Sequence, residues 1–100
     1  MENYILVGHI PIIELDLNKW ADWFGAADRK IAKTSIGRYL VSTVFLGIDH
    51  SFGCGVPMLF ETMVFADDSL DEEYCKRCST WTEAEAQHSK AVEYFSSKGK

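Results

Sequence analysis

The segment from residue 49 to residue 55 concentrates the side chains best suited to chemistry. It holds an acid, an imidazole, a hydroxyl and a thiol in the run Asp49-His50-Ser51-Phe52-Gly53-Cys54-Gly55. An acid next to a histidine can orient the imidazole, and a nearby hydroxyl or thiol can then act as a nucleophile. The same residue types also form ordinary turns. Two interpretations stay open: a structural turn, or a contact site for a ligand or partner that uses Asp49, His50, Ser51 and Phe52.

Glu61 stands in unusual surroundings. It alternates with Leu59, Met63 and Phe65, so a predicted strand places its carboxylate on an apolar face. If that face is buried, the charge needs a partner or its pKa must rise. The candidate partners are Arg29, Arg38 and His88. The alternative is an exposed strand face, or a structural salt bridge that satisfies Glu61.

His88 lies on the apolar stripe of a predicted final helix. A histidine at the edge of a core usually bonds a carbonyl or a carboxylate, and Glu61 is one candidate. The functional alternative is a polar site shared with Glu61 or His50. A ligand-binding or nucleotide-binding module with its site at residues 49–57 would need these groups to converge. So would a small hydrolase that uses Asp49, His50 and Glu61.

The charge balance bears on the class of partner. The chain has 15 acids and 10 bases, a formal net charge of −5. A general nucleic-acid binder needs a basic footprint, so direct nucleic-acid binding is not expected. Five acids fall close together, at Asp67, Asp68, Asp71, Glu72 and Glu73. They form either a solvated loop or a patch that docks on a basic protein surface.

The cysteines form one short motif, Cys75-Lys76-Arg77-Cys78. A structural zinc site needs four ligands, and no second pair has regular spacing. On a strand, residues three apart point to opposite faces, so the two thiols would not bind one metal. We expect two unpaired thiols and no metal. The sequence also lacks the Gly-rich phosphate and dinucleotide motifs, so no cofactor is expected.

These side chains must be positioned by the elements around them. The periodicity predicts an α+β fold: an antiparallel sheet of about five strands with two helices packed on it, in the order β-β-α-β-β-β-(β)-α. Residues 1–100 are expected to form a single domain, with 96–100 as a frayed tail. The expected segments are a hairpin of residues 4–7 and 12–15 with Gly8 to Pro11 between, a helix from 17 to about 28, strands at 31–35, 39–48, 59–66 and 73–78, and a helix from 81.

Local signals define the two helices. Asp16 is expected to cap the first helix by accepting from its first-turn amides. Thr80 and Glu83 have the spacing of a capping box at the start of the second helix. The strands at 39–48 and 59–66 are apolar on both alternating faces, which is typical of central strands covered on both sides.

Two expectations concern the setting of the protein. The N-terminus has no charged leader before an apolar run, and no stretch is long and apolar enough to span a membrane. We therefore expect a cytoplasmic protein with reduced thiols and no membrane partner. The apolar central hairpin also favours a homodimer in which a second copy covers one face of the sheet.

Several stretches carry a resemblance to a known family. They are STVFLGIDHSFG at 42–53, PMLFETMVF at 57–65, WADWF at 20–24 with ADR at 27–29, and the region from STW at 79–81 to His88. Together they cover nearly the whole chain. The chain resembles a widespread family of small phage- and prophage-encoded proteins with no assigned activity. It departs from that family's pattern at Cys75 and Cys78.

The resemblance implies a genomic setting. Small acidic phage proteins often work by binding, either to inhibit host defence machinery such as CRISPR effectors or to sequester a signalling nucleotide. The resemblance therefore implies a non-catalytic binding protein in the host bacterial cytoplasm. The implied partner is a host or phage protein, and the implied action is anti-CRISPR-like or other inhibition of a host defence system.

Overall fold

The computed structural model describes residues 2–51, 55–67 and 72–98, with only the backbone described at 72, 73 and 98. The α+β prediction is confirmed, and the elements follow the expected order. They are β1 (Tyr4–Val7), β2 (Ile10–Ile13), α1 (Leu17–Ala26), β3 (Lys30–Ile36), β4 (Tyr39–Phe45), β5 (Phe60–Ala66), β6 (Glu72–Cys78) and α2 (Trp81–Lys98).

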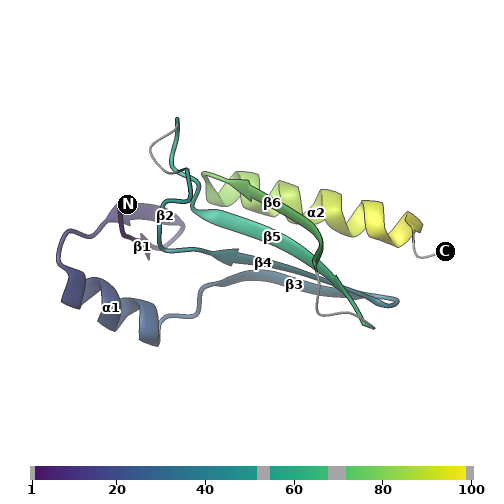
Figure 1. The fold of residues 1–100 in the computed structure, drawn as a ribbon, viewed down its shortest axis with the longest axis horizontal. Coiled ribbons are helices and arrows are strands. Elements are labelled where there is room, and N and C mark those ends of the chain that lie inside the picture. Colours follow the sequence, from purple (N-terminus) through teal and green to yellow (C-terminus); the bar gives the residue numbers. More distant parts are fainter. Residues whose placement is uncertain (1, 52–54, 68–71, 99–100) are drawn as a thin grey trace.

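The strands form two sheets, which corrects the prediction of one sheet of about five strands. β3, β4, β5 and β6 make a four-stranded antiparallel meander, and β1 pairs only with β2. An isolated bridge between Asn3 and Ile48 joins the chain just before the N-terminal hairpin to the chain beyond the end of β4. The two sheets therefore lie end to end, and the molecule is elongated, measuring 47 × 28 × 24 Å (Figure 1).

The turn of the N-terminal hairpin is shorter than predicted. β2 begins at Ile10, so Pro11 lies inside the strand and only Gly8 and His9 form the turn. Gly8 has φ of +62°, which glycine adopts without strain. The amide of Tyr4 donates to the Gly47 carbonyl at 2.8 Å, away from β2. By the same alternation the Pro11 nitrogen lies on the outer edge, where no donor is needed.

The core lies between the four-stranded sheet and α2, which crosses one face of it (Figure 1). Along β4 and β5 every second side chain is buried on this face, including Val41, Phe45, Phe60 and Val64. The side chains on the opposite face are half-buried, so α2 covers one face alone. Within the chain, the expectation that these strands are covered on both sides is therefore met on one face only.

The two helices pack differently. In α2 the predicted capping box is present, since the Glu83 amide donates to Thr80 Oγ1 and the Thr80 amide donates to Glu83 Oε1, both at 3.1 Å. The helix continues to Lys98, so the first part of the expected frayed tail is helical. Asp16 caps α1 as predicted, accepting from two amides, but α1 has no buried residue.

α1 packs at the end of the sheet rather than across it. The Trp20 indole donates to the carbonyls of Tyr4 at 3.1 Å and Gly47 at 3.0 Å, and the Trp23 ring meets Phe45 edge-on. The expectation that both helices cover the sheet is corrected, because these contacts hold α1 against β1 and the end of β4. Neither helix in the described residues is long and apolar enough to cross a membrane.

Candidate functional site

Asp49 holds its own loop closed. Its carboxylate accepts from the Ser51 amide at 2.7 Å, the Ser51 hydroxyl at 2.9 Å and the Met58 amide at 2.9 Å. Burial alone would raise the pKa of Asp49, but these donors stabilise the charged form and lower the pKa overall. Asp49 therefore ties residues 49–51 to residue 58 as a carboxylate, and its oxygens are occupied by structural bonds.

His50 is also bonded within its own segment. Its Nδ1 lies 2.8 Å from the carbonyl oxygen of Ile48, which requires Nδ1 to donate. Among the described residues, the hydrogen bonds to the Asp49 carboxylate come from Ser51 and Met58. Phe52 and Cys54 of the predicted contact site lie outside the described residues.

Glu61 has a structural ion-pair partner, which none of the three candidates supplies. Its Oε2 lies 2.8 Å from Nε of Arg77, the residue opposite it on β6. The Cys75 thiol lies 3.6 Å from the same oxygen. The Glu61 side chain is only 12% exposed, so the ion pair compensates a largely desolvated carboxylate. The salt-bridge alternative raised from the sequence therefore describes Glu61.

His88 belongs to a buried polar ladder that runs across the sheet beneath α2. Its Nε2 bonds Thr34 Oγ1 at 2.9 Å, and its Nδ1 bonds Thr43 Oγ1 at 2.7 Å. Thr43 bonds Thr62 at 2.7 Å, and Gln87 donates to Thr62 at 3.0 Å. Burial lowers the pKa of His88, which favours the neutral imidazole. The ladder connects β3, β4 and β5 to the helix.

The titratable groups singled out in the sequence do not converge. Thr62 faces α2 and bonds to the helix, so its neighbour Glu61 projects from the opposite face of the sheet. His88 therefore lies on one side of the sheet and Glu61 on the other, while His50 lies in the loop beyond β4. A ligand site that joins His50, Glu61 and His88 is therefore not formed. The hydrolase combination of Asp49, His50 and Glu61 stays a prediction.

The acidic cluster is only partly described. Asp67 is exposed, and its amide donates to the Arg38 carbonyl at 2.8 Å. Asp68 and Asp71 lie outside the described residues. Glu72 and Glu73 begin β6, and their side chains also lie outside what is described. The interpretation of this cluster as a docking patch stays a prediction.

The two cysteines of the C-x-x-C motif face opposite sides of β6. Cys78 is buried under α2, whereas Cys75 is exposed on the face that carries Glu61. The predicted alternation along the strand is therefore confirmed. In the part of the chain that is described, no three His, Cys, Asp or Glu side chains gather as metal ligands would.

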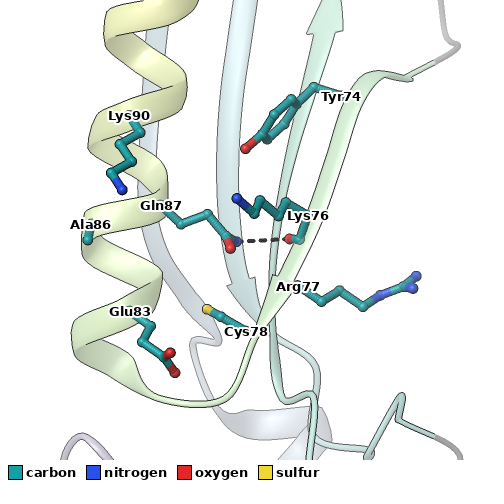
Figure 2. Close-up of a pocket in the computed structure, with 8 residues that line it drawn as sticks. All are labelled: Tyr74, Lys76, Arg77, Cys78, Glu83, Ala86, Gln87 and Lys90. Atoms are coloured by element: carbon teal, nitrogen blue, oxygen red, sulfur yellow. Dashed lines mark hydrogen bonds between the residues drawn. The ribbon is translucent and has the colours of Figure 1, made fainter.

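A groove that the sequence analysis missed runs between β6 and the first half of α2 (Figure 2). Its volume is about 300 Å³, and its lining is polar and apolar in about equal parts. Gln87 spans the groove floor and donates to the Lys76 carbonyl at 2.9 Å. No sequence motif marks this groove, because its residues come from a strand edge and a helix that only the fold brings together.

The second feature missed from the sequence is the outer face of the N-terminal hairpin. Tyr4 and Leu6 turn inward to the core, so the opposite face carries Ile5 and Val7 with their cross-strand partners Ile12 and Ile10. We name these four residues the hairpin outer face. Val7, Ile10 and Ile12 are 59%, 62% and 44% exposed. One feature of the sequence could have indicated this face: the hairpin has more aliphatic residues than a two-stranded sheet can bury.

Comparison with known proteins adds no relative: no protein-family profile, curated protein or solved structure matches this chain.

Proposed function

We propose that the protein is a non-catalytic binding protein that acts by protein–protein contact through the hairpin outer face. The observation that carries the proposal is the exposure of aliphatic side chains there. Of the eight large hydrophobic residues found exposed among the described residues, six fall between positions 7 and 17, and three of these six lie on the hairpin outer face. Contiguous exposed apolar surface on a small domain is typical of an interaction site.

The hairpin presents this face in a fixed orientation. The His9 ring stacks on the Trp81 indole with centroids 3.7 Å apart and planes 4° from parallel, which joins the turn to the start of α2. Tyr4 anchors the other end through its backbone bond to Gly47. A rigid apolar surface loses little conformational entropy on binding, which favours affinity.

The outer edge of β2 argues for recognition by side chains rather than by strand addition. Pro11 places a nitrogen without a hydrogen on that edge, so an added strand would find one donor missing. The partner is therefore expected to lay an apolar surface on the hairpin. The chain carries a net charge of −5, with Glu2 just before the hairpin and Glu14 and Asp16 just after it. A partner surface with basic margins would complement them.

Catalysis is a weaker proposal for this fold. Asp49 is committed to its loop, Glu61 to Arg77 and His88 to two threonines, so each candidate acid or base serves structure. The resemblance to phage- and prophage-encoded proteins supplies the setting for the proposal. The partner would be a host protein in the bacterial cytoplasm, and the action would be inhibition of a defence component, such as a nuclease with a basic surface.

The test compares two variants that each place acid on exposed aliphatic positions. Val7→Asp/Ile10→Asp alters the hairpin outer face, and Val56→Asp alters a position that is 62% exposed elsewhere. Affinity capture from a defence-positive host lysate should recover the same partner with the wild type and Val56→Asp, but not with the hairpin variant. Phage plating on that host should follow the same pattern.

Equal capture by all three proteins would rule out the hairpin outer face. Capture by none, with no change in plating, would rule out an inhibitor of that host's defences. Circular dichroism of the hairpin variant checks that a loss of capture is not caused by unfolding. The substituted side chains are exposed, so the fold should be retained.

A further inference from the structure

The groove between β6 and α2 gathers positive charge on an acidic protein. Lys76 and Lys90 line it from the strand and the helix, and among the described residues neither is in an ion pair. Arg77 is already engaged, because its guanidinium pairs with Glu61 on the other face of the sheet. Figure 2 shows Lys76 extending from β6 toward α2 and Arg77 pointing away from it. The groove thus has two ammonium groups available for an anion.

Tyr74 adds a neutral hydrogen-bond donor beside Lys76 in the groove (Figure 2). Burial raises the pKa of its phenol, so the hydroxyl keeps its proton at neutral pH and can donate. The ring is held by an edge-on contact with Phe95, with centroids 6.0 Å apart. In Figure 2 the Tyr74 hydroxyl and the Lys76 side chain point to the same side of β6.

The walls of the groove are tied together before any ligand binds. The Gln87 amide nitrogen donates to Thr62 on β5 at 3.0 Å and to the Lys76 carbonyl on β6 at 2.9 Å. The helix is therefore fixed to both strands beneath the groove. Such preformed sites avoid part of the cost of ordering on binding.

We propose that this groove binds a small phosphate monoester, with the phosphate between Lys76, Lys90 and Tyr74. Donors from two walls suit a tetrahedral anion, whose three terminal oxygens can accept in different directions, better than a planar carboxylate. Glu83 lines the opposite end of the groove. Its charge disfavours a second anionic group there and favours a ligand whose far end carries hydroxyl or amino donors. This inference goes beyond the protein-contact function and uses none of its residues.

The test is a titration followed by amide chemical shifts in ¹⁵N–¹H correlation spectra. The probes are inorganic phosphate, ribose 5-phosphate and ribose, so that one pair differs only in the phosphate group. Saturable shifts at Tyr74, Lys76, Gln87 and Lys90 are expected with both phosphates and not with ribose. Ribose 5-phosphate should bind more tightly than inorganic phosphate, because its hydroxyls can donate toward Glu83.

Charge-matched variants separate a site from general attraction. Lys76→Met/Lys90→Met should weaken binding by about tenfold or more, because two charge-assisted hydrogen bonds are lost. Lys19→Met/Lys33→Met removes the same charge away from the groove and should change affinity by less than about twofold. Lys76→Arg/Lys90→Arg should retain most of the affinity.

Three results would overturn the proposal: equal losses in the two methionine variants, equal shifts with ribose, or no saturable shifts with either phosphate. None of these outcomes depends on the hairpin outer face. Failure of the groove and failure of the protein-contact function are therefore separate results.

Discussion

The four-stranded sheet with α2 and the N-terminal hairpin with α1 use apolar residues in opposite ways. In the sheet and α2, side chains such as Phe45, Phe60 and Val64 are fully buried, and two apolar clusters flank a polar ladder centred on His88. In the N-terminal part, α1 buries no residue and the hairpin leaves four of its six Val, Ile and Leu side chains exposed.

This difference separates the residues that stabilise the fold from those that we propose to bind a partner. Exposed aliphatic side chains contribute little to folding, so selection for stability alone does not account for the hairpin outer face. The core of the sheet and α2 also takes in Tyr4 of the hairpin, and contacts of Trp20 and His9 hold the N-terminal part against it. The four-stranded sheet and α2 thus form the buried core, and the hairpin attached to them presents a small apolar surface.

The largest effect is expected in the core. Phe60→Ala removes a fully buried ring that packs against Phe45 and Trp81, and it should lower the free energy of unfolding by about 3–5 kcal/mol. The control Leu17→Ala, at a position 64% exposed in α1, should change it by less than about 0.5 kcal/mol. Urea denaturation measures both. Similar losses in the two variants would contradict the contrast between the regions.

The second-largest loss of stability is expected at Gly47, where α1 packs against the chain beyond β4. A Cβ at Gly47 would lie 2.9 Å from the Phe24 ring, and φ is +77°, so Gly47→Ala should cost about 1–3 kcal/mol and loosen α1. Gly25→Ala within α1 meets nothing within 4 Å and should stabilise by up to about 1 kcal/mol. Hydrogen exchange of the α1 amides should rise in the first variant and not in the second. The reverse order would show that α1 does not dock through Gly47.

A pH effect should appear in the sheet and α2. The unfolded His88 takes up its proton near pH 6.5, whereas burial lowers the pKa of the folded imidazole. The unfolded state therefore binds more protons just below pH 6.5, so stability is complete above that value and falls as the pH drops toward the folded pKa. Urea midpoints across this range should show the loss in the wild type and not in His88→Gln. An unchanged slope in that variant would assign the effect to another group.

Asp49 should affect stability in a separate, more acidic pH range. Its folded pKa lies below the ordinary value of 3.8, so its contribution is complete above that value and is lost as the pH falls further. Asp49→Asn should remove this second loss while leaving the His88 loss intact. A common window for both residues would contradict their separate environments.

The smallest effect on stability is expected at the hairpin outer face. Ile10→Asp replaces a side chain that is 62% exposed, so the free energy of unfolding should change by no more than about 1 kcal/mol. A loss as large as that of Phe60→Ala would mean that this face belongs to the core.

The elements were largely predictable because their signals are local. Asp16 caps α1 and Thr80 pairs with Glu83, as their spacings predict. The runs of β4 and β5 that are apolar on both faces also predicted strands, but they did not reveal that α2 covers one face only. Pro11 was assigned to the turn because its strand position depends on which edge of β2 faces outward, which the local sequence does not determine.

The site was less predictable because it depends on which faces meet. Glu61 and His88 both stand among apolar residues in the sequence, yet they lie on opposite sides of one sheet. The groove joins Tyr74 and Lys76 of an edge strand to Lys90 of a helix, and only the fold brings these residues together. The hairpin outer face could not be predicted without knowing which side chains are buried, because isoleucines are buried in most proteins.

Photocrosslinking in cells of the proposed bacterial host tests most directly whether the hairpin outer face contacts a partner protein. A photoreactive phenylalanine analogue is placed at position 10, on the hairpin outer face, or at position 56 as an equally exposed control. We expect one discrete crosslinked host protein from position 10 and none from position 56. No product from either position, the same product from both, or only a crosslink to a second copy of the chain would contradict this expectation.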